Sequence, residues 1–227
     1  MPNPVSSNLV ITGPTADVRA FVAAVKSKTG EFDFNGVVPM PAELKGTTAP
    51  VKIQTAEEIA ATVKKWQDDL VKTGKSFEDN GPWGLGMTQE RHDELIIKYG
   101  CADWYSWCVA NWGTKWGAYD YCEWIVADGD NGNSTASIGF CTAWSPPFQF
   151  FIAASAKFPT LTFDLEFADE GGCFVGESSF ADGDITEDVE YGWDSIPGIR
   201  IRNNVGCGPT EDDLVTSDDA DGVTVTA

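Results

Sequence analysis

Aromatic side chains gather in one short stretch of the chain. Trp104, Trp107, Trp112 and Trp116 lie within thirteen positions of a sequence that has nine tryptophans, and Trp144 follows at the end of an expected strand. Such rings either dock one element on a core or line a cleft in which a planar group stacks. We favour docking in the core. The alternative is a cleft that sequesters a nucleotide-like small molecule, lined by Trp104, Trp107, Trp112, Trp116 and Trp144, with Lys115 available for a phosphate.

The sequence gives little support for a catalytic site. His92 is the only histidine, it falls in the middle of an expected surface helix, and there is no G-x-S-x-G elbow, so Ser/His/Asp and Cys/His chemistry lack a base. Neither Gly84-Leu85-Gly86 nor Gly171-Gly172 belongs to a dinucleotide-binding or P-loop motif. We therefore expect a protein that is not an enzyme and uses no cofactor, although an unrecognised hydrolase or transferase stays open.

Metal sites are also not expected. The six cysteines form no C-x-x-C pair, so free thiols are favoured over zinc ligands. Asp128-Gly-Asp-Asn-Gly-Asn133 resembles the start of a calcium loop, but Gly139 stands where that loop needs a bidentate glutamate. A hairpin turn is the better interpretation of this segment.

Charge is distributed unevenly along the chain. The net charge is −20, and residues 164–227 hold 17 Asp or Glu against Arg200 and Arg202 alone. Direct binding to nucleic acid is not expected, since that affinity comes from Lys and Arg on phosphates. We expect instead a partner protein with a basic surface. The candidate acidic surface comprises Asp182, Asp184, Glu187, Asp188, Glu190, Glu211, Asp212 and Asp213. The first five of these could also hold a divalent ion, but a solvated face is preferred.

The elements that would position these residues can be read from periodicity. Residues 8–13 predict a strand and 18–25 a helix; residues 118–127 and 134–144 predict a hairpin, followed by a helix to 158 and strands at 161–168 and from 170 to about 180. This order is the split βαβ, ferredoxin-like plan, an α+β fold with an antiparallel sheet. Residues 32–117 then form a helical insertion between the first helix and the second strand. The expected domain covers residues 1–180, and residues 181–227 form an acidic extension with a disordered end. Within this extension a small extra strand or a packed strap stays open, through Tyr191, Trp193, Ile196, Ile199 and Ile201.

The sequence also suggests where the protein works. It has no pattern of a basic segment followed by an apolar one at its start, and no apolar run long enough to span a bilayer. We expect no membrane partner and a location in the cytoplasm.

Three motifs occur in an order that points to a known family. They are Asn111-Trp-Gly-Thr-Lys-Trp-Gly117, Phe140-Cys-Thr-Ala-Trp-Ser-Pro-Pro147 and Glu170-Gly-Gly-Cys-Phe-Val-Gly176. Together they resemble the YubB-like (Api-ninety-two-like) family of phage and plasmid proteins over residues 5–180. The resemblance implies a ferredoxin-like domain in a protein of a mobile genetic element, with no established activity and no catalytic residues to carry over.

The leading functional hypothesis combines this resemblance with the charge. We expect a phage or mobile-element accessory protein that binds and inhibits a basic host protein, such as a defence nuclease, by imitating the phosphates of nucleic acid. Sequestration of a nucleotide-like molecule in the tryptophan cleft is one alternative. A virion or assembly component is another.

Overall fold

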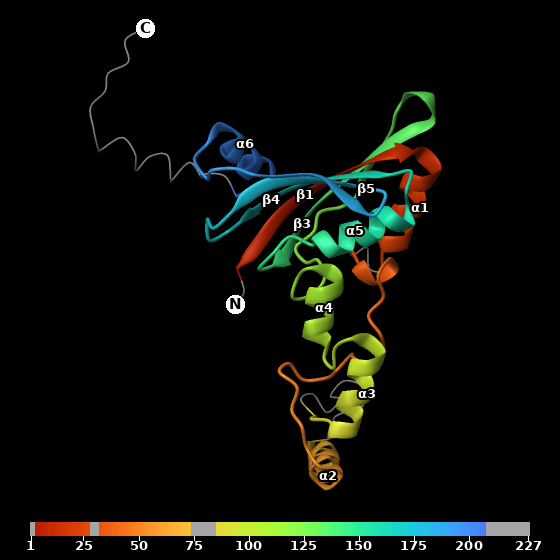
Figure 1. Cartoon of the computed structure of the whole chain (residues 1–227), viewed down its shortest axis with the longest axis vertical. Helices are drawn as coiled ribbons and strands as arrows, with labels where there is room; N and C mark the ends of the chain where they lie inside the picture. The colour runs from red at the N-terminus through yellow and green to blue at the C-terminus, as the bar shows by residue number, and fades with distance from the viewer. Residues whose placement is uncertain (1–2, 28–31, 74–84, 208–227) are drawn as a thin grey trace, which may run out of the picture.

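The computed structural model describes residues 3–27, 32–73 and 85–207. Figure 1 shows a sheet with helices packed beneath it and a narrow helical arm that extends away from it. The elements are β1 (Pro4–Pro14), α1 (Thr15–Val25), η1 (Phe34–Gly36), α2 (Ala56–Thr73), α3 (Gln89–Tyr99), α4 (Trp104–Trp112), β2 (Ile125–Asp128), η2 (Asp130–Gly132), β3 (Asn133–Ala143), α5 (Phe148–Lys157), β4 (Thr162–Asp169), β5 (Val175–Ala181), β6 (Asp184–Glu190) and α6 (Ile196–Asn204).

The sheet has six strands in the order β2-β3-β1-β4-β5-β6, and all neighbours are antiparallel. Leu9 of the central strand β1 faces Ile138 of β3 on one side and Leu165 of β4 on the other. The order β2-β3-β1-β4, with α1 after β1 and α5 after β3, is the ferredoxin-like arrangement. The expected α+β fold class is therefore confirmed.

The main core lies between the sheet and helices α1 and α5, which cover the same face (Figure 1). Alternate residues of β1, among them Leu9 and Ile11, are completely buried on that face, as the two-residue period of a strand requires. Phe21 of α1 meets Phe158, which follows α5, and Phe163 of β4 in edge-to-face contacts at 5.4 and 5.0 Å. These rings join both helices to the sheet.

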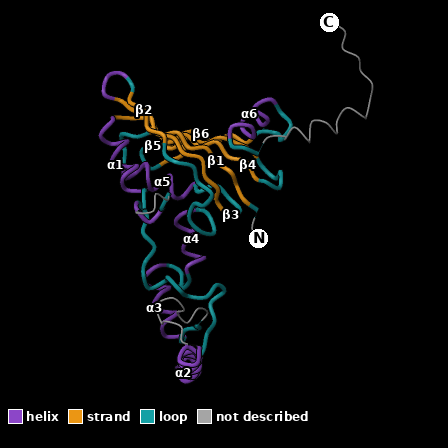
Figure 2. Tube along the Cα trace, turned by 180° about the vertical axis from the view of Figure 1, so that it is seen from behind, coloured by secondary structure: helices purple, strands orange, loops and turns teal. Residues whose placement is uncertain are grey.

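The helical insertion lies where the sequence places it, between α1 and β2. Helices α4, α3 and α2 follow one another outward from the sheet, with α2 at the far end (Figures 1 and 2). Helix α4 begins because the Asp103 carboxylate accepts a hydrogen bond from the Ser106 backbone N–H at 2.8 Å, and it ends at Gly113 in the left-handed conformation. The expected second strand is shorter than 118–127, because Asp120 has φ = 47° and β2 becomes regular only at Ile125.

The sheet does not end at about residue 180. β6 pairs with β5 over its whole length, and α6 packs on β4 and β5 through Ile201, which contacts Ala168 and Val175. The boundary expected at residue 180 thus falls within β5, which is hydrogen-bonded to β6, and residues 184–204 belong to the folded domain. The expected disordered end, residues 210–227, lies outside the described residues.

Candidate functional site

The tryptophan cluster is divided between core and surface. Trp107 and Trp112 are buried, at 6% and 3% exposure, and their rings meet edge to face at 5.2 Å. The Trp112 indole N–H donates a hydrogen bond to the carbonyl of Val38 at 2.9 Å. For these two residues the docking interpretation holds: they fasten α4 to the core rather than line a cleft.

The other members of the cluster border an open groove of about 540 Å³. One wall is residues 49–51, which precede α2; the other is the start of α4, with Trp104 and Tyr105. Lys115 and Trp144 complete the groove, and Asp103 and Ser106 also line it. We call this the aromatic groove. It lies where the insertion joins the sheet, and its size is within the usual range for small-molecule sites.

Lys115 lies between two tryptophan rings. Its ammonium nitrogen is 4.3 Å from the ring centroid of Trp144 and 4.7 Å from that of Trp116, so both rings make cation–π contacts with it. Trp116 stands behind the lysine and does not line the groove. The six residues of the predicted cleft thus separate into three on the groove (Trp104, Lys115, Trp144), one supporting ring (Trp116) and two in the core (Trp107, Trp112).

Trp144 has a special backbone conformation. Its φ is 74°, in the left-handed region that bulky residues seldom adopt, and its side chain is 46% exposed. The backbone N–H of Trp144 donates to the carbonyl of Asn3 at 3.0 Å, which holds the turn in place. The ring faces Tyr105 edge to face at 6.2 Å. The turn after β3 thus presents a large ring to solvent.

A second candidate site is the acidic sheet surface, formed by strands β4 to β6. Residues 158–199 contain eleven Asp or Glu and no Lys or Arg. Five of the predicted acidic residues are exposed, Asp182 in the β5–β6 turn and Asp184, Glu187, Asp188 and Glu190 on edge strand β6. The structure adds three residues that the sequence analysis missed, namely Asp164, Glu166 and Glu177. Glu211, Asp212 and Asp213 lie outside the described residues.

The three missed residues lie on the sheet face opposite α1 and α5. Asp164 and Glu166 alternate with buried Phe163 and Leu165 along β4, and this period-two pattern was the signal available in the sequence. Across the strands, Glu166 pairs with Glu177. With Glu187, these side chains border a shallow hollow of about 440 Å³.

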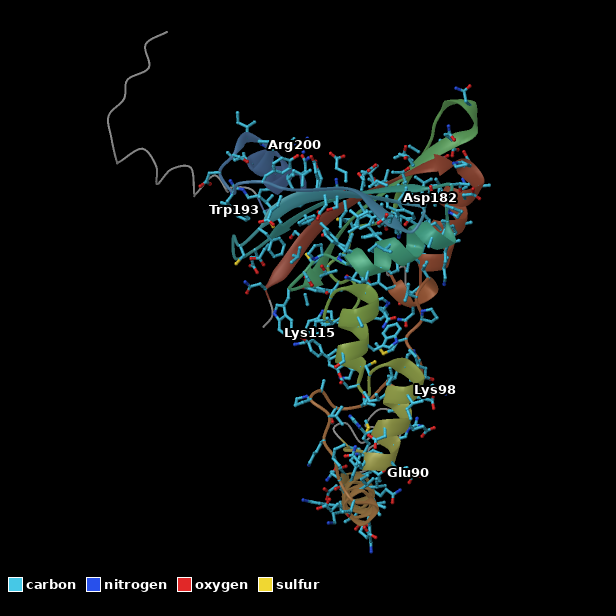
Figure 3. All side chains as sticks on the ribbon, viewed as in Figure 1. Glu90, Lys98, Lys115, Asp182, Trp193 and Arg200 are labelled. Atoms are coloured by element: carbon cyan, nitrogen blue, oxygen red, sulfur yellow. The ribbon has the colours of Figure 1, made fainter. Side chains whose placement is uncertain are left out.

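Helix α6 supplies the cation for one end of this surface. The Arg200 guanidinium lies 2.6 Å from a carboxylate oxygen of Glu177 and 3.8 Å from one of Glu166. The Asn204 amide donates to both oxygens of Glu166 at 3.0 Å. In Figure 3 Arg200 lies at one end of the sheet and Asp182 toward the other. Among the residues that the structure describes, the carboxylates of Asp182 and of β6 form no ion pair of this kind.

The described residues show no site for nucleophilic catalysis or for a metal ion. Burial raises the pKa of the Cys108 thiol to about 12, so this thiol stays protonated at neutral pH. The ring of His92 contacts Asp93 on the surface of α3. Within residues 3–27, 32–73 and 85–207, no three His, Cys, Asp or Glu side chains are grouped to hold a metal ion. At the β2–β3 turn, the Asp128 carboxylate is engaged by Arg19 and Ser134.

Comparison with known proteins agrees with the fold. Residues 123–201 match the family model described as "Ferredoxin-like domain in Api92-like protein". This part of the chain is similar to the ferredoxin-like domain of Api92-like proteins. The match confirms the family resemblance and extends past residue 180 through β6 and into α6. Its description names a fold and no activity.

A crystal structure of the protein api92 from Yersinia pseudotuberculosis is also similar to this chain. Identity is 12%, the alignment covers 85% of this chain and 99% of that one, and the TM-score is 0.42. A search of curated proteins finds no match. Among the described residues, no helix is both long and apolar enough to cross a bilayer.

Proposed function

We propose that this protein is a non-catalytic binding protein whose acidic sheet surface docks on a basic surface of another protein. The observation that supports the proposal most directly is that β4, β5 and β6 contain acidic residues and no Lys or Arg, with half-buried carboxylates on one sheet face and exposed carboxylates along the edge strand β6. Charge of one sign over neighbouring strands steers a partner of opposite charge and rejects nucleic acid.

The arrangement on the sheet strengthens this interpretation. Glu166 and Glu177 face each other directly, a like-charge pair that destabilises a sheet unless a cation lies nearby. Arg200 provides that cation from α6, and it shows that the surface accommodates a guanidinium group between two carboxylates. A basic partner would meet the same chemistry at Asp164 and Glu187, which border the adjoining hollow.

Acidic residues on an edge strand also have a purely structural use. Charges on an exposed edge prevent two sheets from pairing edge to edge. This role explains Glu187, Asp188 and Glu190 on β6, but it does not explain Asp164, Glu166 and Glu177, which lie on interior strands β4 and β5. The interior carboxylates therefore favour a binding role over edge protection alone.

We extend the proposal to the biological setting that the family resemblance suggests. In that setting the protein belongs to a phage or other mobile element and acts in the host cytoplasm. Its partner is a host protein, such as a defence nuclease, whose basic surface ordinarily contacts nucleic acid. A row of carboxylates would occupy that surface in place of phosphates, so binding would inhibit the host protein.

Affinity capture from host lysate tests this proposal. The full chain is immobilised, lysate is applied at about 0.1 M salt, and the column is washed to about 1 M salt, where the Debye length falls from about 10 Å to about 3 Å. We expect a specific basic protein that elutes as the salt rises. Recovery of no partner, or of one whose retention is indifferent to salt, would contradict the proposal.

A further inference from the structure

The aromatic groove carries a second binding chemistry, on the other side of the sheet from the acidic sheet surface. Figure 3 places Lys115 below the sheet, on the side of the helical arm, and Arg200 above it. None of the residues that line the groove belongs to β4, β5 or β6. An inference about this groove is therefore independent of the proposal about the acidic surface.

The groove offers three kinds of contact to a ligand. Pro50 and Val51 provide an apolar wall, Trp104 and Tyr105 provide aromatic surface opposite it, and Trp144 closes one end with a half-exposed ring. Few side chains supply polar groups. The two oxygens of Asp103 already accept hydrogen bonds from the backbone N–H and hydroxyl of Ser106, both at 2.8 Å.

Lys115 supplies the cation of the groove, and Asp103, whose carboxylate caps the start of α4, supplies its one carboxylate among the described residues. In the part of the chain that the structure describes, the ammonium group of Lys115 has no carboxylate within ion-pair distance, and its two contacts are the rings of Trp116 and Trp144. Cation–π contacts fix the position of an ammonium group and leave its charge uncompensated. The protein as a whole has a charge of −20 and therefore repels anions over most of its surface. An ammonium group without an ion-pair partner, such as that of Lys115, gives an anionic group one place to bind.

The backbone at Trp144 supports a functional reason for the exposed ring. A left-handed conformation at a bulky residue is unfavourable, and such positions are found preferentially at ligand sites. A glycine would fit the turn without this cost. The tryptophan instead places its ring beside Lys115, at 4.3 Å from the ammonium nitrogen.

From these contacts we infer that the aromatic groove binds a small molecule that combines a planar aromatic ring with one compact anionic group. The ring lies against Trp144 and Tyr105, and the anion contacts Lys115. Nucleoside monophosphates and aromatic carboxylates both have this chemistry. Adenosine has the ring without the charge, and inorganic phosphate has the charge without the ring.

Isothermal titration calorimetry on the full chain tests the inference. The probes are adenosine monophosphate, indole-3-carboxylate, adenosine and inorganic phosphate. We expect saturable binding of at least one of the two ring-bearing anions, at least about tenfold tighter than adenosine or phosphate, because a charge-assisted contact contributes about that factor. Comparison of the two anions shows whether the site prefers a phosphate or a carboxylate. If neither ring-bearing anion binds, or if phosphate alone binds as tightly, the inference is wrong.

Two variants locate the binding. Lys115→Gln removes the charge and keeps the first two methylenes of the side chain, and it should weaken binding of the ring-bearing anion about tenfold, to the level of the uncharged ring. Trp144→Ala should weaken binding of both charged and uncharged rings. Lys65→Gln, which removes an exposed lysine from α2, is the matched control and should change nothing. Unchanged affinity in Lys115→Gln would overturn the assignment, whether or not Trp144→Ala folds.

A second copy of the chain is the competing occupant of the groove. Sedimentation of the wild-type protein and of Lys115→Gln, each with and without the bound probe, examines this possibility. We expect the same sedimentation coefficient in all four cases. A wild-type dimer that dissociates when the probe binds would show that the groove is an interface between copies, and it would overturn the small-molecule inference.

Discussion

Glu166 of β4 and Glu177 of β5 stand directly opposite each other on antiparallel strands, on the sheet face that α1 and α5 leave open. Two carboxylates at this spacing repel each other. Arg200 of α6 lies within 4 Å of both, and the Tyr191 hydroxyl donates to Glu177 at 2.5 Å. Helix α6 of the same chain thus stabilises one end of the acidic sheet surface, and the position of α6 in the sequence does not predict this role.

Arg200→Gln should therefore destabilise the protein by about 0.5–1 kcal/mol, since the contact is partly exposed to solvent. Urea unfolding at neutral pH measures the change in free energy. The double variant Arg200→Gln, Glu177→Gln should recover most of the loss, because it also removes the like-charge pair. Arg19→Gln is the control. It also removes an arginine from an ion pair, but the cross-strand neighbour of its partner Asp128 is Ser134, so no pair of facing carboxylates is left without a cation. A double variant less stable than the single one would contradict this account.

The loop before the arm should respond to acid through Glu43. Hydrogen bonds from Lys98, Tyr99 and Arg91 lower the pKa of Glu43 from 4.5 to about 2. A carboxyl whose pKa is lower in the folded state stabilises the fold fully above its unfolded pKa, and the contribution is lost as the pH falls through the folded pKa. Wild type should exceed Glu43→Gln in free energy of unfolding at pH 7, and the difference should shrink between about pH 4.5 and pH 2. A difference that is constant over this range would show that Glu43 acts only by packing.

The tryptophans should divide into two classes when each is removed. Trp112→Ala opens a cavity in the core and leaves the Val38 carbonyl without its donor, so it should cost about 3–5 kcal/mol. Trp144→Gly relieves the left-handed backbone, a gain of about 1 kcal/mol that offsets the lost ring contacts of similar size. Its free energy of unfolding should thus stay within about 1 kcal/mol of wild type. Equal losses for the two variants would mean that Trp144 is also a core residue.

Thiol labelling should follow burial. Cys122 and Cys173 are exposed and should react first with a disulfide reagent, Cys122 faster because a hydrogen bond to Asp169 raises the pKa of the Cys173 thiol. Cys108 should react only on unfolding, because burial raises its pKa to about 12. Mass spectrometry of the early products identifies the labelled positions. Early modification of Cys108 in the native protein would contradict the packing of α4.

Sequence patterning was sufficient for the ferredoxin-like core, because its strands and helices carry period-two and period-3.6 apolar patterns that few other arrangements satisfy. The same reasoning ends the sheet too early, at about residue 180, and omits strand β6. β6 is an edge strand with four charged residues among seven, and its pairing with β5 depends on a turn at Asp182 and Gly183, both with positive φ, rather than on apolar alternation.

The candidate sites show the same limit. The sequence spacing predicts one tryptophan cluster, but it does not distinguish buried from exposed members. The indole N–H of Trp112 donates to a carbonyl 74 positions away in the sequence, whereas the ring of Trp144 is partly exposed to solvent. Likewise, the pairing of Glu166 with Glu177 depends on strand register, which is fixed by the fold as a whole. Residues exposed by a turn were predictable from local sequence, whereas those opposed across strands were not.

The most direct test of the central claim is the dissociation constant between this protein and the partner captured from lysate, measured for three chains. The first is wild type, and the second, the hollow variant, replaces two carboxylates that border the hollow of the acidic sheet surface by Asp164→Asn and Glu187→Gln. The third removes two exposed charges from the arm by Asp68→Asn and Glu90→Gln. We predict affinity at least about tenfold weaker for the hollow variant and unchanged for the arm variant. Equal affinities for all three chains would contradict the claim that the acidic sheet surface is the binding site.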